Sequence, residues 1–308
     1  MTNSYAPSGA QGEPPASLRK QVEAALGRAS LSWTRPDTGL SAAHRYVVAL
    51  ESGDRIFVKA ATTVQTAQWL RNERVAIEQA PRYAPAIMAW LDAADAFPVL
   101  VVEALAGHWP ASHRGVDWQD GDLERVVARL SELSHVAGPG ALPVAASARS
   151  TVWRSIAHAP EAFLRLGLCS RGWFAAHSAA LIHAEEQLDR SGRAFAHGDM
   201  RSDNICMMED GPRFVDWSHA RRGSAQTDLA GFLPAAHLEG GPAPHEILPR
   251  GGMWGAAQSA ELSRRAVEDT AAPAWLARVF RRLAAINLDW AIVGLGLGPR
   301  DGPRWQEL

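Results

Sequence analysis

The sequence predicts an α+β protein in which a β-rich first third precedes a mostly helical remainder. Two apolar runs rich in strand-forming residues, 46–50 and 55–60, are joined by a Ser-Gly-Asp turn, as expected for antiparallel strands. Beyond residue 120, apolar residues recur every three or four positions, which is the helical period. With 308 residues, 47% of them hydrophobic, the chain is long enough for one sizeable core or for two lobes that share a cleft.

The first third predicts a β-meander followed by one helix and two further strands. Residues 1–16 are rich in Ser, Gly, Pro and Ala, so we expect disorder there, followed by a short amphipathic helix from Ser17. Residues 99–102 are too apolar and too β-branched for a surface strand, which predicts burial on both faces. The other predicted elements are strands at 31–33, 46–50, 55–60 and 86–91, and a helix at 65–79.

The helical period in the second part predicts helices over residues 120–135, 152–167, 171–190 and 274–295. Asp122 and Glu124 fall in the first turn of the first of these helices, where negative charge complements the helix dipole. In the last helix, an apolar stripe that includes Trp275, Ile286 and Trp290 is interpreted as core rather than as a ligand-binding face. Residues 138–147 are dominated by Pro, Gly and Ala and predict a linker.

Composition and charge make several classes of function improbable. The formal net charge of −2 argues against a nucleic-acid-binding protein, which usually carries a basic face. Cys169 and Cys206 are far apart in sequence and suggest neither a disulfide framework nor a zinc site, so a reducing compartment is expected. No apolar run is long enough to cross a bilayer, and no secretory signal is evident. We therefore expect a cytoplasmic protein that binds neither nucleic acid nor membrane.

The most informative stretch is residues 195–206, followed by residues 213–218. It contains a tight polar loop, a short strand, a turn with glycine and a second strand. Two strands joined in this way bring their ends together, so Asp199, Asn204 and Asp216 can converge. One carboxylate can orient an acceptor hydroxyl and take its proton, while an amide oxygen and a second carboxylate hold Mg²⁺ against nucleotide phosphates. The sequence therefore predicts metal-assisted phosphoryl transfer at this point.

The His-Gly-Asp triplet at 197–199, Asn204 and the Asp-Trp pair at 216–217 resemble the catalytic segment of the aminoglycoside phosphotransferase and choline kinase family of small-molecule kinases. In that family the loop reads H-G-D-x-x-x-x-N, and the metal-binding aspartate begins a D-W or D-x pair. The resemblance implies a two-lobed protein-kinase-like fold. Its N-terminal lobe, residues 17–106, would hold an antiparallel sheet and one key helix, and its C-terminal lobe, residues 107–308, would be mostly helical.

The resemblance also assigns the chemistry, with Asp199 as the catalytic carboxylate and Asn204 and Asp216 as Mg²⁺ ligands. Lys59 ends an apolar strand, where a lysine ordinarily faces solvent, but the resemblance implies that it pairs with Glu73 and holds nucleotide phosphates. Glu78 is the alternative partner, and a solvated helix-face carboxylate is the ordinary interpretation of either glutamate.

Two further segments are assigned to the ATP or GTP co-substrate by the resemblance. Ser41 lies in a loop, residues 39–43, that would fold over the phosphates, although an ordinary hairpin turn fits the same residues. Glu103 and Leu105 lie in a segment, residues 103–107, that resembles the hinge between lobes, where backbone groups would hold the base. Backbone recognition leaves no side-chain signature, so the choice between ATP and GTP stays open.

Other polar residues near this segment have supporting or alternative roles. His197 is expected to brace the loop through backbone hydrogen bonds. The resemblance, which includes a D-L-A run at 228–230, implies that Asp228 supports the catalytic-loop backbone, with helix N-capping as the alternative. Arg201 could contact the transferred phosphoryl group, and Asp203 could meet a cationic acceptor or join the metal shell. The run at 200–203 departs from the small residues common in the family, which weakens any transfer of a particular acceptor.

Three more residues near the catalytic segment have simpler expectations. Cys206 follows Asn204 on an apolar strand and is expected to be a packed core thiol. His219 and Arg221 are interpreted as exposed loop residues, with phosphate contact as the alternative.

These observations predict Mg²⁺-dependent transfer of the γ-phosphoryl group of ATP or GTP to a hydroxyl of a small molecule. An aminoglycoside or another hydroxylated antibiotic is the first expectation, which would make the protein a resistance kinase. The alternatives are a metabolic kinase for an amino alcohol, a sugar or a nucleoside, and a non-catalytic nucleotide-binding protein. A loop bracketed by residues 240–242 and 249–252 is interpreted as a wall of the acceptor pocket. Candidate acidic residues for lining that pocket are Glu239, Glu246, Glu261, Glu268 and Asp269.

Overall fold

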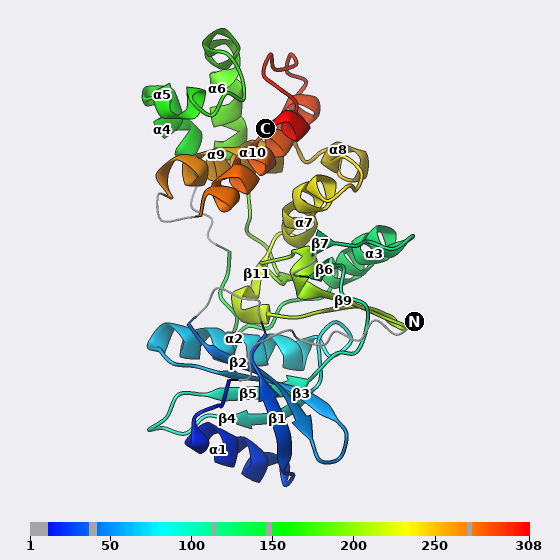
Figure 1. Ribbon diagram of the computed structural model, residues 1–308. Helices are drawn as coiled ribbons and strands as arrows, with labels where there is room; N and C mark the ends of the chain where they lie inside the picture. Colours follow the sequence, from blue (N-terminus) through cyan, green and yellow to red (C-terminus); the bar gives the residue numbers. More distant parts are fainter. Residues whose placement is uncertain (1–11, 37–41, 113–114, 146–149, 270–272) are drawn as a thin grey trace. The chain divides into compact units, whose positions relative to one another are not determined.

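The structure, a computed structural model, describes residues 12–36, 42–112, 115–145, 150–269 and 273–308 (Figure 1). The chain divides into two compact units. The first comprises Met1–Val144 and Gly192–Ala225, and the second comprises Ala145–Ser191 and Gln226–Leu308. Most of the N-terminal segment predicted to be disordered, and Ser41, lie outside the described residues. Within the described ranges, no helix is long and apolar enough to cross a membrane.

The first unit is built on a five-stranded antiparallel sheet with strand order β1-β2-β3-β5-β4. Figure 1 shows helices α1 and α2 on opposite sides of this sheet. The predicted meander, the following helix and the two further strands are all present. The bounds are α1 Ala16–Leu26, β1 Ser30–Thr34, β2 His44–Leu50, β3 Arg55–Ala60, α2 Val64–Gln79, β4 Ile87–Leu91 and β5 Val99–Glu103.

The two faces of this sheet have different tasks. One face forms a hydrophobic core with α1, into which Tyr46, Val48, Ile56 and Val58 point. Since side chains alternate along a strand, the intervening residues of β2 and β3 point to the opposite face. Lys59 lies on that opposite face and is buried. The sheet therefore supplies both the core of this unit and one wall of a polar site.

The rest of the first unit contains one helix and several short strands. Strands β9 and β10 form the predicted hairpin, with Ile205 opposite Phe214, and strand β8 pairs with β11. The bounds are β6 Ala111–Ser112, β7 Gly115–Val116, α3 Asp122–Ser134, β8 Ala194–Ala196, η1 Ser202–Asn204, β9 Ile205–Met208, β10 Gly211–Phe214, η2 Trp217–His219 and β11 Arg221–Gly223. The pairing of β9 with β10 brings the end of the polar loop at Asn204 beside the segment that leads to Asp216.

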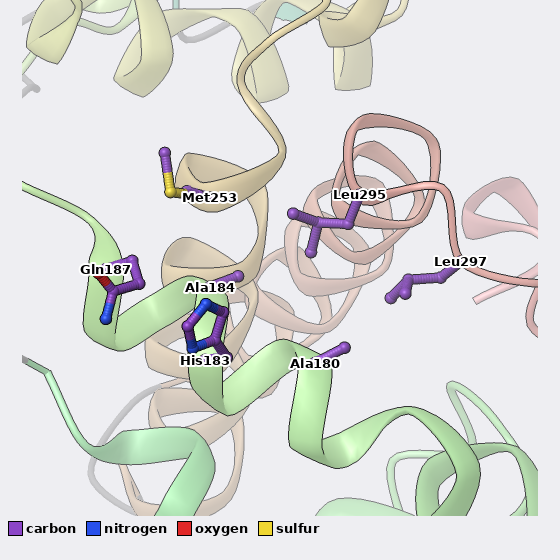
Figure 2. Close-up of a pocket in the computed structure, with 7 residues that line it drawn as sticks. All are labelled: Ala180, His183, Ala184, Gln187, Met253, Leu295 and Leu297. Atoms are coloured by element: carbon purple, nitrogen blue, oxygen red, sulfur yellow. The ribbon is translucent and has the colours of Figure 1, made fainter.

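The second unit is helical. Its core contains Trp153, Phe163, Phe174 and Leu288. The bounds are α4 Val152–His158, α5 Glu161–Leu164, α6 Arg171–Gln187, α7 Thr227–Leu238, α8 Pro244–Ile247, α9 Gly252–Glu268, α10 Ala274–Leu295 and η3 Trp305–Glu307. A hollow of about 400 Å³ in this unit is shown in Figure 2, and it is lined by Ala180, His183, Ala184, Gln187, Met253, Leu295 and Leu297.

Three sequence expectations for this unit need correction. The single helix predicted over 152–167 is wrong, because the chain leaves α4 at Ala159 and begins α5 after Pro160, and proline removes a helical donor. The helix predicted over 171–190 ends earlier, at Gln187. The apolar stripe of α10 is buried at Ile286 and Trp290, but Trp275 is 57% exposed.

Candidate active site

The backbone before Asp199 is fixed by a glycine and a histidine. Gly198 has a φ of +84°, and a Cβ there would lie 2.4 Å from the carbonyl oxygen of His219, so no larger residue fits without a backbone shift. His197 is fully buried. Its Nε2 lies 3.0 Å from the carbonyl oxygen of Val215, and its Nδ1 accepts the Asp199 N–H at 3.3 Å. A carbonyl only accepts, so Nε2 carries the proton, and both ring nitrogens bind backbone.

Asn204 connects the polar loop to the strand that ends at Asp216. Its side-chain Nδ2 donates to the backbone carbonyl oxygen of Asp199 at 2.8 Å. The backbone carbonyl oxygen of Asn204 accepts from the Val215 N–H at 3.0 Å. The Asp199 carbonyl can only accept, so the amide nitrogen must face it. The side-chain oxygen of Asn204 is therefore left for another partner.

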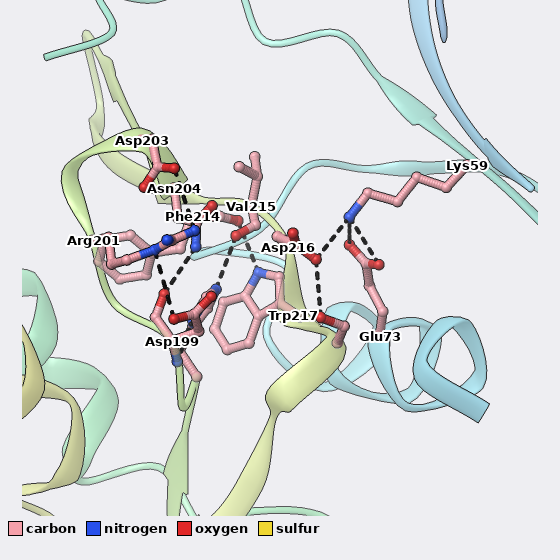
Figure 3. A network of polar contacts seen from close by, with 12 residues as sticks. Lys59, Glu73, Asp199, Arg201, Asp203, Asn204, Phe214, Val215, Asp216 and Trp217 are labelled. Atoms are coloured by element: carbon pink, nitrogen blue, oxygen red, sulfur yellow. Dashed lines mark hydrogen bonds and ion pairs between the residues drawn. The ribbon is translucent and has the colours of Figure 1, made fainter. Parts of the chain in front are cut away.

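An ion-pair network of two buried residues, Lys59 and Glu73, and the partly exposed Asp216 lies beside this loop (Figure 3). Lys59 Nζ donates to both carboxylate oxygens of Glu73, at 2.7 and 3.0 Å, and to Asp216 Oδ1 at 3.1 Å. Burial opposes the charge on Lys59, but the two carboxylates outweigh it and raise the pKa of the ammonium group. Lys59 therefore stays charged and joins β3, α2 and the loop after β10 at one point.

The electrostatics of the two carboxylates in this network differ. The pKa of Asp216 is held well below its usual range, chiefly by the charge of Lys59, with further hydrogen bonds from Lys59 and from Ser218 Oγ at 3.0 Å. Burial raises the pKa of Glu73, although the charge of Lys59 and the backbone N–H of Trp217 oppose that rise. Glu78, the alternative partner for Lys59, instead pairs with Arg74 on the exposed side of α2.

Asp216 also has an unusual backbone. Its φ is +65°, and it is the only residue other than glycine with a positive φ in the part of the chain that the structure describes. Aspartate and asparagine tolerate this region better than most residues. The conformation turns the chain from β10 directly into η2, so that Asp216 points toward Lys59 while the ring of Trp217 packs against His197, with centroids 4.6 Å apart.

Asp199 itself is more open. Its side chain is 35% exposed, and Arg201 Nε lies 3.6 Å from Asp199 Oδ1. The same guanidinium, through Nη2, lies 3.3 Å from Asp203 Oδ2. Arg201 thus stands between two carboxylates on the surface of the loop, as Figure 3 shows.

The oxygen atoms available in this site fit a magnesium ion. The Asn204 side-chain oxygen is not used by the Asp199 carbonyl, and the ion pair and the Ser218 hydrogen bond of Asp216 both go to Oδ1. No three His, Cys, Asp or Glu side chains among the described residues are close enough to hold a metal ion by themselves. Mg²⁺ is commonly held by one or two protein oxygens, with phosphates and water completing its shell.

The remaining predicted residues lie as follows. Glu103 ends β5, and its carboxylate accepts from the Ala86 N–H at 2.8 Å, while Leu105 is partly buried in the segment that follows. Asp228 is buried in the first turn of α7. It is the second residue of that helix and not its N-cap, so the N-capping alternative does not hold.

Three residues after or beside the loop can also be placed. Cys206 is fully buried, and burial raises the pKa of its thiol to about 12, which makes it unreactive. His219 is exposed, with its ring 5.6 Å from that of Trp69 on α2. Arg221 Nη2 donates to the carbonyl oxygen of Gly198 at 3.5 Å, so it supports the loop backbone.

Two polar residues of the site are not predicted from the sequence. Ser218 follows the Asp-Trp pair, and its hydrogen bond to Asp216 could have been suggested by its two-residue spacing. Arg45 stands directly opposite Lys59 in the β2–β3 pairing, and only knowledge of the strand register could have indicated it.

A lysine–glutamate pair that contacts an aspartate on a neighbouring loop, behind an antiparallel sheet, is the arrangement of a protein-kinase-like phosphotransferase. The sequence model of the phosphotransferase enzyme family, APH, matches residues 32–275, which is more than half of the chain. The chain therefore belongs to this family and is a small-molecule kinase. No curated protein sequence matches it.

Solved structures with the same fold include enzymes for several acceptors. A spectinomycin phosphotransferase in complex with ADP and spectinomycin is 14% identical, with a TM-score of 0.54 over 91% of this chain and 94% of that one. A putative fructosamine-3-kinase from Thermobifida fusca is 20% identical, with a TM-score of 0.52 over 91% and 99%. The GDP complex of an aminoglycoside 2'-phosphotransferase is 12% identical, with a TM-score of 0.57 over 89% and 99%. These likenesses confirm the predicted protein-kinase-like fold.

Proposed function

We propose that this protein transfers the γ-phosphoryl group of ATP or GTP to a hydroxyl of a small molecule in a Mg²⁺-dependent reaction. The observation that carries the proposal is the position of Lys59, whose ammonium group contacts Glu73 and Asp216 together. A buried lysine paired to a helix carboxylate and directed at a second carboxylate is suited to holding nucleotide phosphates beside a metal ion.

The residues of the site divide the reaction between them. Asp199 orients the acceptor hydroxyl and takes its proton as the oxygen attacks the γ-phosphorus and the bond to the β-phosphate oxygen breaks. Lys59 contacts the phosphates and is fixed by Glu73. Asn204 and Asp216 would hold Mg²⁺, which when bound neutralises charge on the phosphates. Arg201 would approach the group being transferred, and its distance of 3.6 Å from Asp199 supports this role. Catalysis would rest mainly on positioning and charge stabilisation.

The leading acceptor is an aminoglycoside or another hydroxylated antibiotic. Membership of the family supports this choice, and proteins with the same fold include a spectinomycin phosphotransferase and a macrolide 2'-phosphotransferase. Asp203 would help to receive a cationic acceptor, because its side chain is 44% exposed and it shares the single guanidinium of Arg201 with Asp199, which leaves one negative charge unbalanced.

A metabolic acceptor, such as a sugar, an amino alcohol or a nucleoside, is the second candidate. The carboxylates of Glu261 and Glu268, two of those considered for a polycationic acceptor, both pair with the single guanidinium of Arg264, so half of their negative charge is already balanced. The likeness to a putative fructosamine-3-kinase is compatible with this candidate.

The test is release of nucleoside diphosphate with Mg²⁺ and ATP or GTP across a panel of hydroxylated antibiotics and small metabolites. Release that depends on one acceptor identifies the substrate class. The control is Asp199→Asn, which should fold normally and lose about 10²- to 10⁴-fold in turnover, the usual contribution of a positioned acid–base group. Near-normal turnover of the variant would remove Asp199 from the mechanism. Absence of nucleotide binding by the wild-type protein would favour a non-catalytic role.

A further inference from the structure

Arg45 is the cross-strand neighbour of Lys59. In the antiparallel pairing of β2 with β3, the two residues are directly opposite each other. Directly opposed residues in such a pair have side chains on the same face, with Cβ atoms about 4.5–5.5 Å apart. The register therefore brings a second cation to the place where Lys59 meets its carboxylates.

The packing of the sheet shows which face this is. Tyr46, next to Arg45, is fully buried in the core beneath the sheet together with Val58, next to Lys59. Arg45 must then point to the opposite face, as Lys59 does. Arg45 is only partly buried, whereas Lys59 is buried, so Arg45 is the more accessible of the two cations.

Arg45 also changes the charge balance of the site. Two like charges directly opposite each other in a sheet are destabilising unless anions compensate them. Lys59 and Arg45 together balance the negative charges of Glu73 and Asp216, whereas Lys59 alone would leave an excess of negative charge. An anionic nucleotide would thus meet an ion-pair network around Lys59 without excess negative charge.

We propose that Arg45 binds the phosphate chain of the nucleotide as a second cation beside Lys59. Arginine offers several donors in a planar group that suits phosphate oxygens, and its charge does not depend on pH. This inference rests on the proposed phosphotransferase function and names a further binding residue of the same site. Loss of Arg45 should then weaken the binding of nucleotides that carry a phosphate chain and leave the binding of nucleosides nearly unchanged.

The experiment compares Arg45→Gln and Arg45→Lys with the unmodified chain. Binding of the triphosphate, diphosphate and monophosphate of adenosine and guanosine, and of the free nucleosides, is measured by calorimetry with and without Mg²⁺ and without any acceptor. Arg45→Gln should weaken triphosphate and diphosphate binding by about 10- to 100-fold, the effect of losing one charged hydrogen bond, and nucleoside binding by less than twofold. Arg45→Lys should lie between, because it keeps the charge.

Arg55→Gln is the matched control. Arg55 is an exposed arginine at the start of the same strand as Lys59, four residues away, or about 13 Å at 3.3 Å per residue. The substitution removes the same charge from the same sheet and should leave all affinities unchanged. Thermal unfolding of every variant checks that the fold is retained.

The proposal is overturned if Arg45→Gln leaves diphosphate and triphosphate binding unchanged. It is also overturned if the variant weakens the binding of nucleosides and of triphosphates equally, since that result would indicate a structural role. Failure of the proposed function looks different: nucleotides would bind with the predicted dependence on Arg45, but no acceptor would be phosphorylated. A wild-type chain that binds none of these nucleotides would overturn both proposals.

Discussion

The two halves of the candidate site are built in opposite ways. Around Lys59, the side chains of the lysine and Glu73 are 9% and 4% exposed, and their contact is 2.7 Å. Around Asp199, the side chains are a third to a half exposed, and Arg201 lies 3.6 Å from Asp199 and 3.3 Å from Asp203. One half contains a buried and closely bonded pair that contacts the partly exposed Asp216, and the other is open and loosely paired.

This difference has an electrostatic consequence. Buried charges interact strongly, and each must keep its partner, because removing one leaves the other desolvated and unpaired. Exposed ion pairs are screened by water and salt and contribute little to stability. The buried half should therefore couple folding to the chemistry, whereas the open half should affect the reaction with little effect on the fold.

The largest expected effect separates the two halves directly. Lys59→Met should lower the free energy of unfolding by about 3–5 kcal/mol, since it leaves Glu73 buried without its partner, and it should also abolish detectable phosphoryl transfer. Asp199→Asn, in the open half, should change the unfolding free energy by less than about 0.5 kcal/mol. Urea unfolding of both variants gives the comparison.

The chain contains a suitable control for Lys59→Met. Lys20 is the only other lysine in the sequence and is exposed on α1, so Lys20→Met removes the same group without an effect beyond experimental error. If Lys59→Met were as stable as Lys20→Met, the ion-pair network would not support the fold.

A second prediction concerns Gly198, which precedes Asp199 and closely approaches the backbone of His219. Gly198→Ala places a Cβ 2.4 Å from the carbonyl oxygen of His219, so the loop or η2 must move. We expect a loss of about 1–3 kcal/mol in unfolding free energy and a fall in turnover, because the backbone of Asp199 is displaced.

Gly53→Ala separates backbone strain from steric overlap in that experiment. Gly53 has a similar φ of +89°, but a Cβ added there would meet no atom within 4 Å. The variant should lose only the cost of a left-handed backbone, about 1 kcal/mol, with no change in turnover. Equal losses for the two variants would mean that the close approach of His219 is unimportant.

The parts of the site close in sequence could be predicted from the residues. Asn204 and Asp216 flank two short strands joined by a turn at Gly211, and the observed β9–β10 hairpin follows from that local pattern. Predicting the pair between Lys59 and Glu73 required the family resemblance. A strand lysine is rarely buried without a partner, and the sequence alone does not identify that partner. Neither the local pattern nor the family resemblance could indicate Arg45, since its position opposite Lys59 is set by the strand register.

In the helical unit, the sequence predictions missed helix α9 and the break at Pro160. Helix α9 is not predicted because its buried face consists largely of small residues, and their burial depends on the approach of α10. A Cβ on Gly255 would lie 2.7 Å from the carbonyl oxygen of Asn287, so the two helices pack too closely for larger residues. Hydrophobic period alone does not reveal such a contact. The break at Pro160 could have been predicted from proline chemistry.

The smallest expected effect is the pH dependence of the stability that Asp216 contributes. Because the pKa of Asp216 is lowered in the folded protein, its contribution to stability is present above the pKa of the unfolded chain, about 4. That contribution is lost as the pH falls through the lower folded value. Asparagine tolerates the same backbone conformation, so Asp216→Asn isolates the charge. We expect the variant to be less stable than wild type by about 1–2 kcal/mol at pH 7.

Urea unfolding at pH 7, 5, 4 and 3 measures this difference. The gap between wild type and Asp216→Asn should be constant from pH 7 to 5 and should shrink below about pH 4, the ordinary range of an aspartate. Asp199→Asn serves as the matched loss of one carboxylate from the open half, and at pH 7 it should differ from wild type by less than about 0.5 kcal/mol. A gap for Asp216→Asn that does not change with pH would mean that its effect arises from packing and not from the charge of Lys59, and the electrostatic contrast between the halves would then be lost.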